Sequence, residues 1–157
     1  MNTLDAGTPF PQIQLNTVGG RTRTLGKALD GHEWQLVVVY RGLHCPICKR
    51  YLSQLQEMAS AFYDQKVEVI AVSADPLGKA QKMVEEQALF ISAPRSPQET
   101  DRPFAEPGTF VVNGDGSLQI VDVSNAPFAR PDLDALLRGI TFVREKNYPI
   151  RGTRARP

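Results

Sequence analysis

The two cysteines of the chain, Cys45 and Cys48, stand three positions apart in the motif C-P-I-C. They follow the apolar run at 36–40 and precede an amphipathic segment that starts at Lys49. A strand, a C-x-x-C motif and a helix in this order place two thiols on the first turn of a helix, where they can close a disulfide ring. The unpaired N–H groups and the positive end of the helix dipole stabilise a thiolate there. The pattern therefore indicates a dithiol redox site.

The two thiols are expected to have different roles. Cys45 precedes the helix and is expected to be the more exposed thiol, which makes it the candidate nucleophile. Its neighbours Arg41, His44 and Lys49 are expected to lower its pKa below the roughly 8.5 of a free thiol. Cys48 lies one turn further into the helix and would resolve the mixed disulfide. The alternative is that His44 only shapes the turn and that Arg41 only solvates the loop.

Besides redox chemistry, the cysteine pair could be a thiol pair without catalytic function or part of a metal site. A zinc site usually needs three or four protein ligands. The cysteines and imidazoles of the chain are Cys45, Cys48, His32 and His44, and only three of them lie close together in sequence. We therefore expect neither a metal nor another cofactor.

Composition favours one domain of ordinary size over residues 1–157. The formal net charge is +1 and 22% of the residues are charged, so no strong field favours nucleic acid as a partner. No run approaches the roughly 20 apolar residues of a membrane span. The start at 1–5 lacks a basic region followed by an apolar one, which predicts a cytoplasmic protein without a secretory signal. The basic tail at 151–157 is expected to be flexible.

Hydrophobic periodicity predicts alternating strands and helices. The predicted elements are a hairpin from 13–15 and 21–24, a helical turn at 25–29, strands at 34–40, 67–73 and 89–92, helices at 46–62, 76–87 and from 131, and a hairpin from 109–112 and 118–123. Asp75 is expected to cap the helix that follows it. Together these elements predict a three-layer α/β fold, with a central mixed sheet of about five strands flanked by helices and a hairpin at the N-terminal edge. The dithiol would lie at the carboxyl end of the first buried strand, where sites in such sheets are common.

Several segments carry a resemblance to a known family. They are 7–10 (G-T-P-F), 39–48 (V-Y-R-G-L-H-C-P-I-C), 71–75 (A-V-S-A-D), 106–116 (E-P-G-T-F-V-V-N-G-D-G), 127–131 (P-F-A-R-P) and 148–149 (Y-P). On these segments the chain resembles the thioredoxin-fold redoxins. It is most similar to their alkyl hydroperoxide reductase/thiol-specific antioxidant (AhpC/TSA, peroxiredoxin-like) branch. The resemblance implies a thioredoxin-like fold and an oxidoreductase with a redox-active disulfide.

The resemblance also implies a role for Pro107. At other positions the chain departs from the motifs of the family. Pro107 resembles the cis-proline that faces the dithiol in this fold and lets an extended substrate pair with the backbone. Typical peroxiredoxins carry the motif P-x-x-x-T-x-x-C, and counting back from Cys45 those two positions hold Val38 and Gly42. The peroxide-activating arginine of the family would fall near Pro107 and is absent.

These observations favour thiol–disulfide exchange by Cys45 and Cys48. The alternative is a peroxiredoxin-like antioxidant peroxidase that reduces hydroperoxides through Cys45, with a sulfenic acid as intermediate. A third possibility is a copper(I) chaperone that uses the two thiolates and His44, although the spacing in that family is C-x-x-x-C. The expected partners are a protein disulfide or hydroperoxide substrate, an electron-donor thiol system and, as a possibility, a second copy of the chain. No nucleic acid or membrane is expected.

Overall fold

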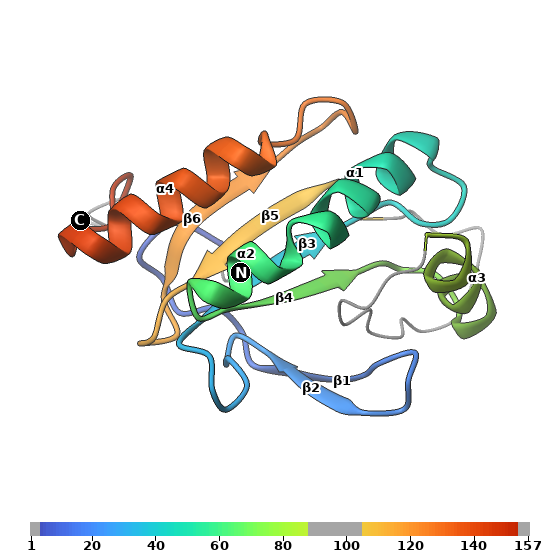
Figure 1. Ribbon diagram of the computed structural model, residues 1–157, viewed down its shortest axis with the longest axis horizontal. Helices are drawn as coiled ribbons and strands as arrows, with labels where there is room; N and C mark the ends of the chain where they lie inside the picture. Colours follow the sequence, from blue (N-terminus) through green and yellow to red (C-terminus); the bar gives the residue numbers. More distant parts are fainter. Residues whose placement is uncertain (1–3, 88–104, 154–157) are drawn as a thin grey trace.

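A mixed sheet of four strands, in the order β4-β3-β5-β6, forms the centre of the computed structural model, which describes residues 4–87 and 105–153 (Figure 1). The strands are β3 (Trp34–Val39), β4 (Val67–Val72), β5 (Gly108–Val112) and β6 (Leu118–Val123). β3 runs parallel to β4 and antiparallel to β5, which in turn pairs antiparallel with β6. The predicted mixed sheet is confirmed with four strands. The fifth candidate, at 89–92, lies outside the described residues, as does much of the stretch before β5.

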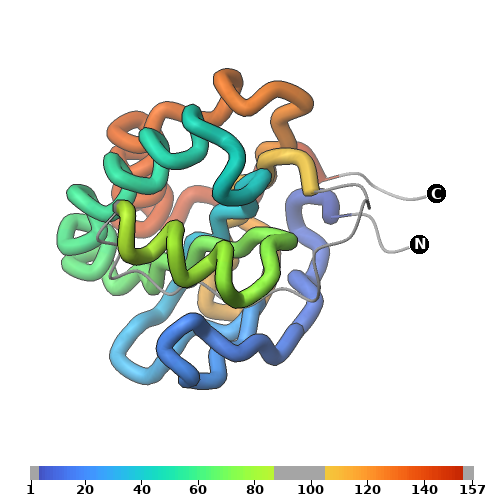
Figure 2. Tube along the Cα trace, turned by 90° about the vertical axis from the view of Figure 1, so that its right-hand side faces the viewer, coloured from blue at the N-terminus to red at the C-terminus, as the bar shows by residue number. Residues whose placement is uncertain are grey.

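The helices lie mainly on one face of this sheet. They are α1 (Pro46–Glu57), α2 (Ala59–Asp64), α3 (Leu77–Gln87) and α4 (Leu133–Lys146). α1, α2 and α4 cover one face, whereas α3 stands beyond the end towards which β3 and β4 run (Figures 1 and 2). Among the described residues, no helix is both long and apolar enough to cross a bilayer.

The two faces of the sheet carry separate apolar clusters. Leu36 and Val38 of β3 pack with the helices, and Val37 between them points into a cluster with Phe10 and Leu25 from the N-terminal segments. Figure 2 shows these N-terminal segments on the side opposite the helices. A strand covered on both faces is expected to be apolar at every position, which explains the uninterrupted run in β3.

The helix after the cysteines is shorter than its sequence pattern predicts. The apolar periodicity at 46–62 predicts one helix, but α1 ends with the cap residue Met58, and α2 begins at Ala59. The start is as expected, because Cys45 has an extended backbone at the N-cap and Pro46 occupies the first turn. Proline costs little there, since its missing N–H would have no partner within the helix.

The predicted N-terminal hairpin is confirmed. Its strands, β1 (Ile13–Asn16) and β2 (Thr22–Leu25), pair antiparallel and form a separate two-stranded sheet. Its second strand ends at Leu25, which is buried in the cluster below the central sheet.

The predicted helical turn at 25–29 is wrong. Gln35 on β3 is buried, and its amide accepts from Gly26 N (2.8 Å) and donates to Lys27 O (3.1 Å). The carboxylate of Glu68 on β4 accepts from Leu29 N (2.9 Å). These side chains bond backbone groups of this segment, which has no helical turn, and a buried backbone group needs one partner or another.

The C-terminal tail is described only in part. Arg151 lies over the ring of Tyr148 at 4.9 Å and donates from Nε to the Tyr148 hydroxyl (3.2 Å). Residues 154–157 lie outside the described residues, so the flexibility of the tail stays a prediction.

Candidate active site

The cysteine pair lies at the carboxyl end of β3, on the first turn of α1. Cys45 and Cys48 form a disulfide, with their Cα atoms 5.2 Å apart. The backbone N–H of Cys48 donates to Cys45 Sγ over 3.2 Å. The sulfur of Cys45 therefore takes the place of the side-chain oxygen that usually caps a helix N-terminus. The same N–H would stabilise negative charge on this sulfur once the disulfide is opened.

Both cysteines are buried in the disulfide form. Cys45 keeps 4% of its surface exposed and Cys48 keeps none. Of the two residues, Cys45 keeps the larger exposed fraction. The nucleophilic role of Cys45 and the resolving role of Cys48 stay predictions.

The loop before Cys45 is held by a carboxylate at the end of the neighbouring strand. Asp75, which is buried, accepts from Leu43 N over 2.7 Å and from the Ser73 hydroxyl over 3.3 Å. Gly42 has a φ of +129°, and a Cβ at this position would lie 2.6 Å from an Asp75 oxygen. The sequence pattern predicts that Asp75 caps the next helix, but its described hydrogen bonds run to this loop and to Ser73. The contact fixes the approach of the chain to Cys45.

An arginine from a distant segment contacts the second sulfur. Arg130, in the connection between β6 and α4, donates from Nη2 to Cys48 Sγ over 3.0 Å and from Nη1 to Pro127 O over 3.2 Å. Its guanidinium lies 5.2 Å from the centre of the Tyr51 ring on α1. The Tyr51 hydroxyl donates to Pro131 O over 3.0 Å, so the same tyrosine also fastens the segment that carries the arginine.

The charged state of this cluster follows from its burial. Burial lowers the pKa of Arg130, and the nearby positive charge of Arg41 lowers it further. Burial raises the pKa of Tyr51 to about 12, so its phenol is neutral at neutral pH. Arg41 therefore lies close enough to Arg130 for the two charges to interact, and a neutral ring lies beneath Arg130.

The residues predicted to assist the thiols lie in different surroundings. Arg41 is half-buried and lies near Arg130, whereas His44 is exposed. Lys49 forms an ion pair with Glu86 of α3 over 2.7 Å. No local pattern predicts a role for Arg130, which is 82 residues from Cys48. The only signal for it is its place in the 127–131 segment of the family resemblance.

The prediction of a cis-proline at 107 is wrong. Among the described residues no peptide bond is cis, and Pro107 is one of them. Pro107 is buried directly before β5, and its carbonyl accepts from Ser124 N over 2.8 Å. This bond extends the pairing of β5 with β6, which a trans peptide and an extended backbone allow. A role for Pro107 in substrate binding stays a prediction.

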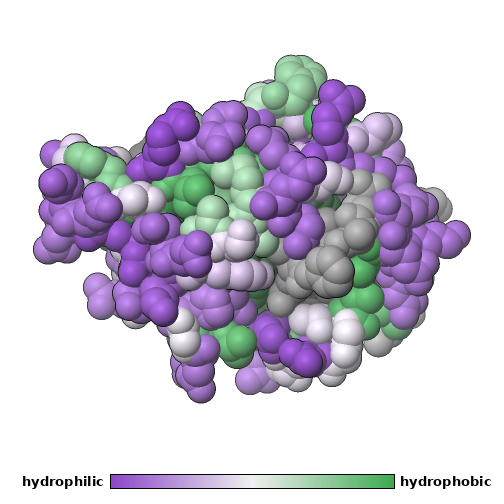
Figure 3. Space-filling model, viewed as in Figure 1, coloured by the Kyte–Doolittle hydropathy of each residue, from purple (hydrophilic) through white to green (hydrophobic). Residues whose placement is uncertain are grey.

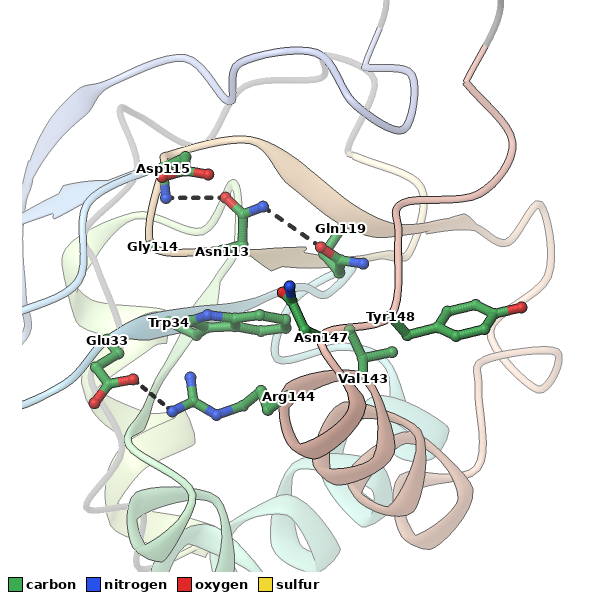
Figure 4. A pocket seen from close by; sticks show the side chains of 10 residues that line it. All are labelled: Glu33, Trp34, Asn113, Gly114, Asp115, Gln119, Val143, Arg144, Asn147 and Tyr148. Carbon is green, nitrogen blue, oxygen red and sulfur yellow. Dashed lines mark hydrogen bonds and ion pairs between the residues drawn. The ribbon is translucent and has the colours of Figure 1, made fainter.

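No metal-binding arrangement is found in the described part of the chain, where no group of three or more His, Cys, Asp or Glu side chains could hold an ion. A hollow of about 320 Å³ does lie at the other end of β3, between Trp34, Asn113 and the end of α4 (Figure 4). Its side chains are mainly polar, and in Figure 4 Arg144 lies along the Trp34 ring and pairs with Glu33. It holds no thiol, and we assign it no function.

Comparison with solved structures confirms the thioredoxin-like fold. The peroxiredoxin-like protein from Aquifex aeolicus is 15% identical, with a TM-score of 0.76 over 91% of this chain and 90% of that chain. Peroxidoxin BcpB from Mycobacterium tuberculosis is 18% identical, with a TM-score of 0.75 over 90% and 99% of the two chains. AhpC from Mycobacterium bovis is 16% identical, with a TM-score of 0.76 over 98% and 100%. No curated protein matches the sequence.

The family follows from the sequence itself. Residues 6–100, more than half of the chain, match the model of the AhpC/TSA family. The matched segment contains the cysteine pair that forms the disulfide at the start of α1. The chain therefore belongs to the AhpC/TSA family and is an oxidoreductase whose chemistry is carried by thiols.

Proposed function

We propose that this protein is a thiol–disulfide oxidoreductase that cycles Cys45 and Cys48 between dithiol and disulfide. The observation that carries the proposal is the disulfide between these residues at the N-terminus of α1. A bond at this position can be opened and closed without unfolding the domain, because both partners belong to one helical turn. The hydrogen bond from Cys48 N to Cys45 Sγ favours Cys45 as the thiolate that attacks.

The reaction proceeds through a mixed disulfide. The Cys45 thiolate attacks a sulfur of the substrate disulfide, and the other substrate sulfur leaves as a thiolate. The Cys48 thiolate then attacks Cys45 Sγ, which closes the intramolecular disulfide and releases the second substrate thiol. A dithiol donor returns two electrons to the protein and restores Cys45 and Cys48 as thiols.

The cellular setting is part of the proposal. A protein disulfide is the proposed substrate, and a cellular dithiol system is the proposed electron donor. We place the protein in the cytoplasm, where thiols are kept reduced and a lone C-x-x-C is more often catalytic than structural. We also propose a single domain over residues 1–157 that can form a homodimer, and neither nucleic acid nor membrane as a partner.

A second candidate function, hydroperoxide reduction, is favoured by membership of the AhpC/TSA family. The Cys45 thiolate would attack the terminal peroxide oxygen, giving a sulfenic acid and releasing an alcohol or water. Cys48 would then condense with the sulfenic acid, releasing water and forming the same disulfide. Against this candidate, Val38 and Gly42 stand where peroxiredoxins carry the proline and threonine of their motif.

Two assays on one set of proteins distinguish the candidates. We expect the wild type to reduce insulin disulfides with dithiothreitol as donor and Cys45→Ser to be inactive. Reduced Cys48→Ser, mixed with insulin after the dithiothreitol has been removed, should accumulate a mixed disulfide that mass spectrometry detects. Full activity of Cys45→Ser would overturn the proposal. In stopped-flow mixing with hydrogen peroxide, we expect the reduced wild type to react no faster than free cysteine. A much faster reaction that Cys45→Ser lacks would establish the peroxidase instead.

A further inference from the structure

The contact of Arg130 distinguishes the two sulfurs. Its Nη2 lies 3.0 Å from Cys48 Sγ, whereas Cys45 Sγ accepts from a backbone N–H. The cation is therefore directed at the cysteine that has no exposed surface, and not at Cys45, which keeps 4% of its surface exposed.

The segment that carries Arg130 is fastened on both sides. The Ser124 hydroxyl lies 2.7 Å from a carboxylate oxygen of Asp122 and 3.1 Å from Ala129 O. These contacts stabilise the connection between β6 and α4 internally. From α1, the Tyr51 hydroxyl donates to Pro131 O over 3.0 Å, and the Tyr51 ring lies beneath the guanidinium. The position of Arg130 is thus set by the fold and does not depend on the sulfur contact alone.

We propose that Arg130 is a catalytic residue that stabilises the Cys48 thiolate as the leaving group when a reductant opens the disulfide at Cys45. This inference rests on the proposed thiol–disulfide exchange. It states which cysteine is attacked and which one leaves when the disulfide is reduced. Burial alone disfavours a thiolate at Cys48, because a charged group loses its hydration there. A guanidinium in hydrogen-bonding contact offsets this cost with a charge-assisted bond.

Atoms and electrons balance in this step. A thiolate of the donor dithiol attacks Cys45 Sγ and forms a mixed disulfide, while the bond between the two protein sulfurs breaks. Its electron pair moves to Cys48 Sγ, next to Arg130. The donor's second thiolate then attacks the donor's own sulfur in the mixed disulfide and releases the Cys45 thiolate. The donor ends as a disulfide, and its two protons pass to the protein thiols or to solvent.

The first test measures the pKa of Cys48 directly. In Cys45→Ser, Cys48 is the only cysteine, so thiolate absorbance near 240 nm reports its ionisation alone. We expect its pKa to lie below the roughly 8.5 of a free thiol, although burial acts in the opposite direction. A pKa above that value would overturn the proposal without any variant of Arg130.

Adding Arg130→Gln to Cys45→Ser removes the cation. We expect the Cys48 pKa to rise by about one unit or more, since an opposite charge at contact distance lowers a pKa by roughly one to three units. Arg144→Gln in the same background is the matched control, because Arg144 lies over the Trp34 ring much as Arg130 lies over Tyr51. In the described part of the chain, the other charges that act on this cluster are that of Arg41, which acts on Arg130, and those of Asp122 and Asp132, which act on Tyr51.

The second test measures the leaving group in the two-cysteine protein. Oxidised Arg130→Gln should be reduced by dithiothreitol roughly three- to tenfold more slowly than wild type at constant pH, because a leaving thiol of higher pKa leaves more slowly. Arg144→Gln should match wild type, and Arg130→Lys, which keeps the charge, should fall between wild type and Arg130→Gln. Equal rates for Arg130→Gln and wild type would overturn the proposal. Thiol–disulfide exchange itself would still stand in that case, because its own test is the activity of Cys45→Ser.

Discussion

An arginine lies over an aromatic ring at each end of the sheet, and the two pairs differ in what else the arginine binds. Arg130 is 5.2 Å from the centre of the Tyr51 ring, and Arg144 is 5.1 Å from the centre of the Trp34 ring. Arg144 also pairs with Glu33 over 2.6 Å, whereas Arg130 donates to Cys48 Sγ over 3.0 Å. Stacking on a ring holds the guanidinium in both places. The additional partner decides whether its charge is neutralised by a carboxylate or directed at a sulfur that gains and loses electrons.

The surroundings of the two arginine–aromatic pairs also differ in how far they are exposed to solvent. Glu33 is 64% exposed at its side chain, and its ion pair borders an open hollow (Figure 4). Such exposed pairs contribute about 0–1 kcal/mol. At the disulfide end the loop before Cys45 is bonded to a buried carboxylate, and Cys48 is fully buried. Buried polar contacts cost more to break, because the group left behind has no water to replace its partner. The disulfide end should therefore be the more sensitive of the two.

The largest effect is expected from Asp75→Ala. It removes the acceptor of Leu43 N, so we expect a loss of roughly 2 kcal/mol in the free energy of unfolding and slower reduction of the disulfide, since the loop before Cys45 loses its anchor. Urea denaturation of the oxidised protein and the rate of reduction by dithiothreitol measure the two effects. Asp64→Ala, at an exposed carboxylate, is the control. Equal stability of the two variants would show that this anchor is not needed.

The next effect is an alkaline loss of stability caused by Tyr51. Its pKa is about 12 in the folded protein against about 10 when unfolded. The unfolded state therefore releases its proton first, and stability falls as the pH rises from about 10 towards 12, by on the order of 2 kcal/mol. The pKa values of Tyr40 and Tyr63 are also raised by burial, so the wild type alone does not isolate this contribution.

Tyr51→Phe separates the contribution of Tyr51 from those of the other tyrosines. Near pH 8 the variant should be about 1 kcal/mol less stable, because Pro131 O loses its donor. By pH 11 the difference should shrink or reverse, since phenylalanine has no proton to lose. Urea denaturation at both pH values measures it. A difference between the two proteins that does not change with pH would contradict the assignment to Tyr51.

A smaller effect is expected from Phe128→Ser. Phe128 stands two residues before Arg130 and is 78% exposed. Figure 3 shows an apolar projection at the top of the molecule, over the connection between β6 and α4. We expect a three- to tenfold loss in kcat/KM for a protein disulfide, since covering one aromatic side chain is worth up to about 2 kcal/mol. Reduction of a small disulfide such as oxidised glutathione should not change.

The matched control for Phe128→Ser is Phe142→Ser, which alters an exposed phenylalanine on α4. It should leave both substrates unaffected. An equal loss with the small disulfide and the protein disulfide would mean that Phe128 acts on the chemistry of the disulfide and not on docking of the partner.

The smallest effect is expected at the opposite end of the sheet. Glu33→Gln removes the ion pair with Arg144 but leaves the Trp34 ring beneath the guanidinium. The free energy of unfolding should fall by less than about 1 kcal/mol, and the rate of disulfide reduction should equal that of wild type. A change in that rate would break the comparison, because it would show that the two ends are coupled.

Local sequence patterns were enough to predict most of the strands and helices and the place of the cysteines among them. The apolar run in β3 predicts burial on both faces, and Pro46 after Cys45 predicts a helix that starts at the first thiol. These signals are local, because a strand or an amphipathic helix shows its period within a few residues. The motifs around the cysteines were also enough to indicate the family.

The distant groups that contact the site follow from the packing of the whole domain and not from any local pattern. Arg130 contacts Cys48 across 82 residues, and the carboxylate of Asp75 binds the loop before Cys45, 32 residues away. In the same way, Gln35 takes the backbone groups of a segment in which local pattern predicts a helical turn. Periodicity reports which face of an element is covered, but not which polar group of another element lies against it. That choice depends on how the covered faces pack together, and it is made only when the whole domain is assembled.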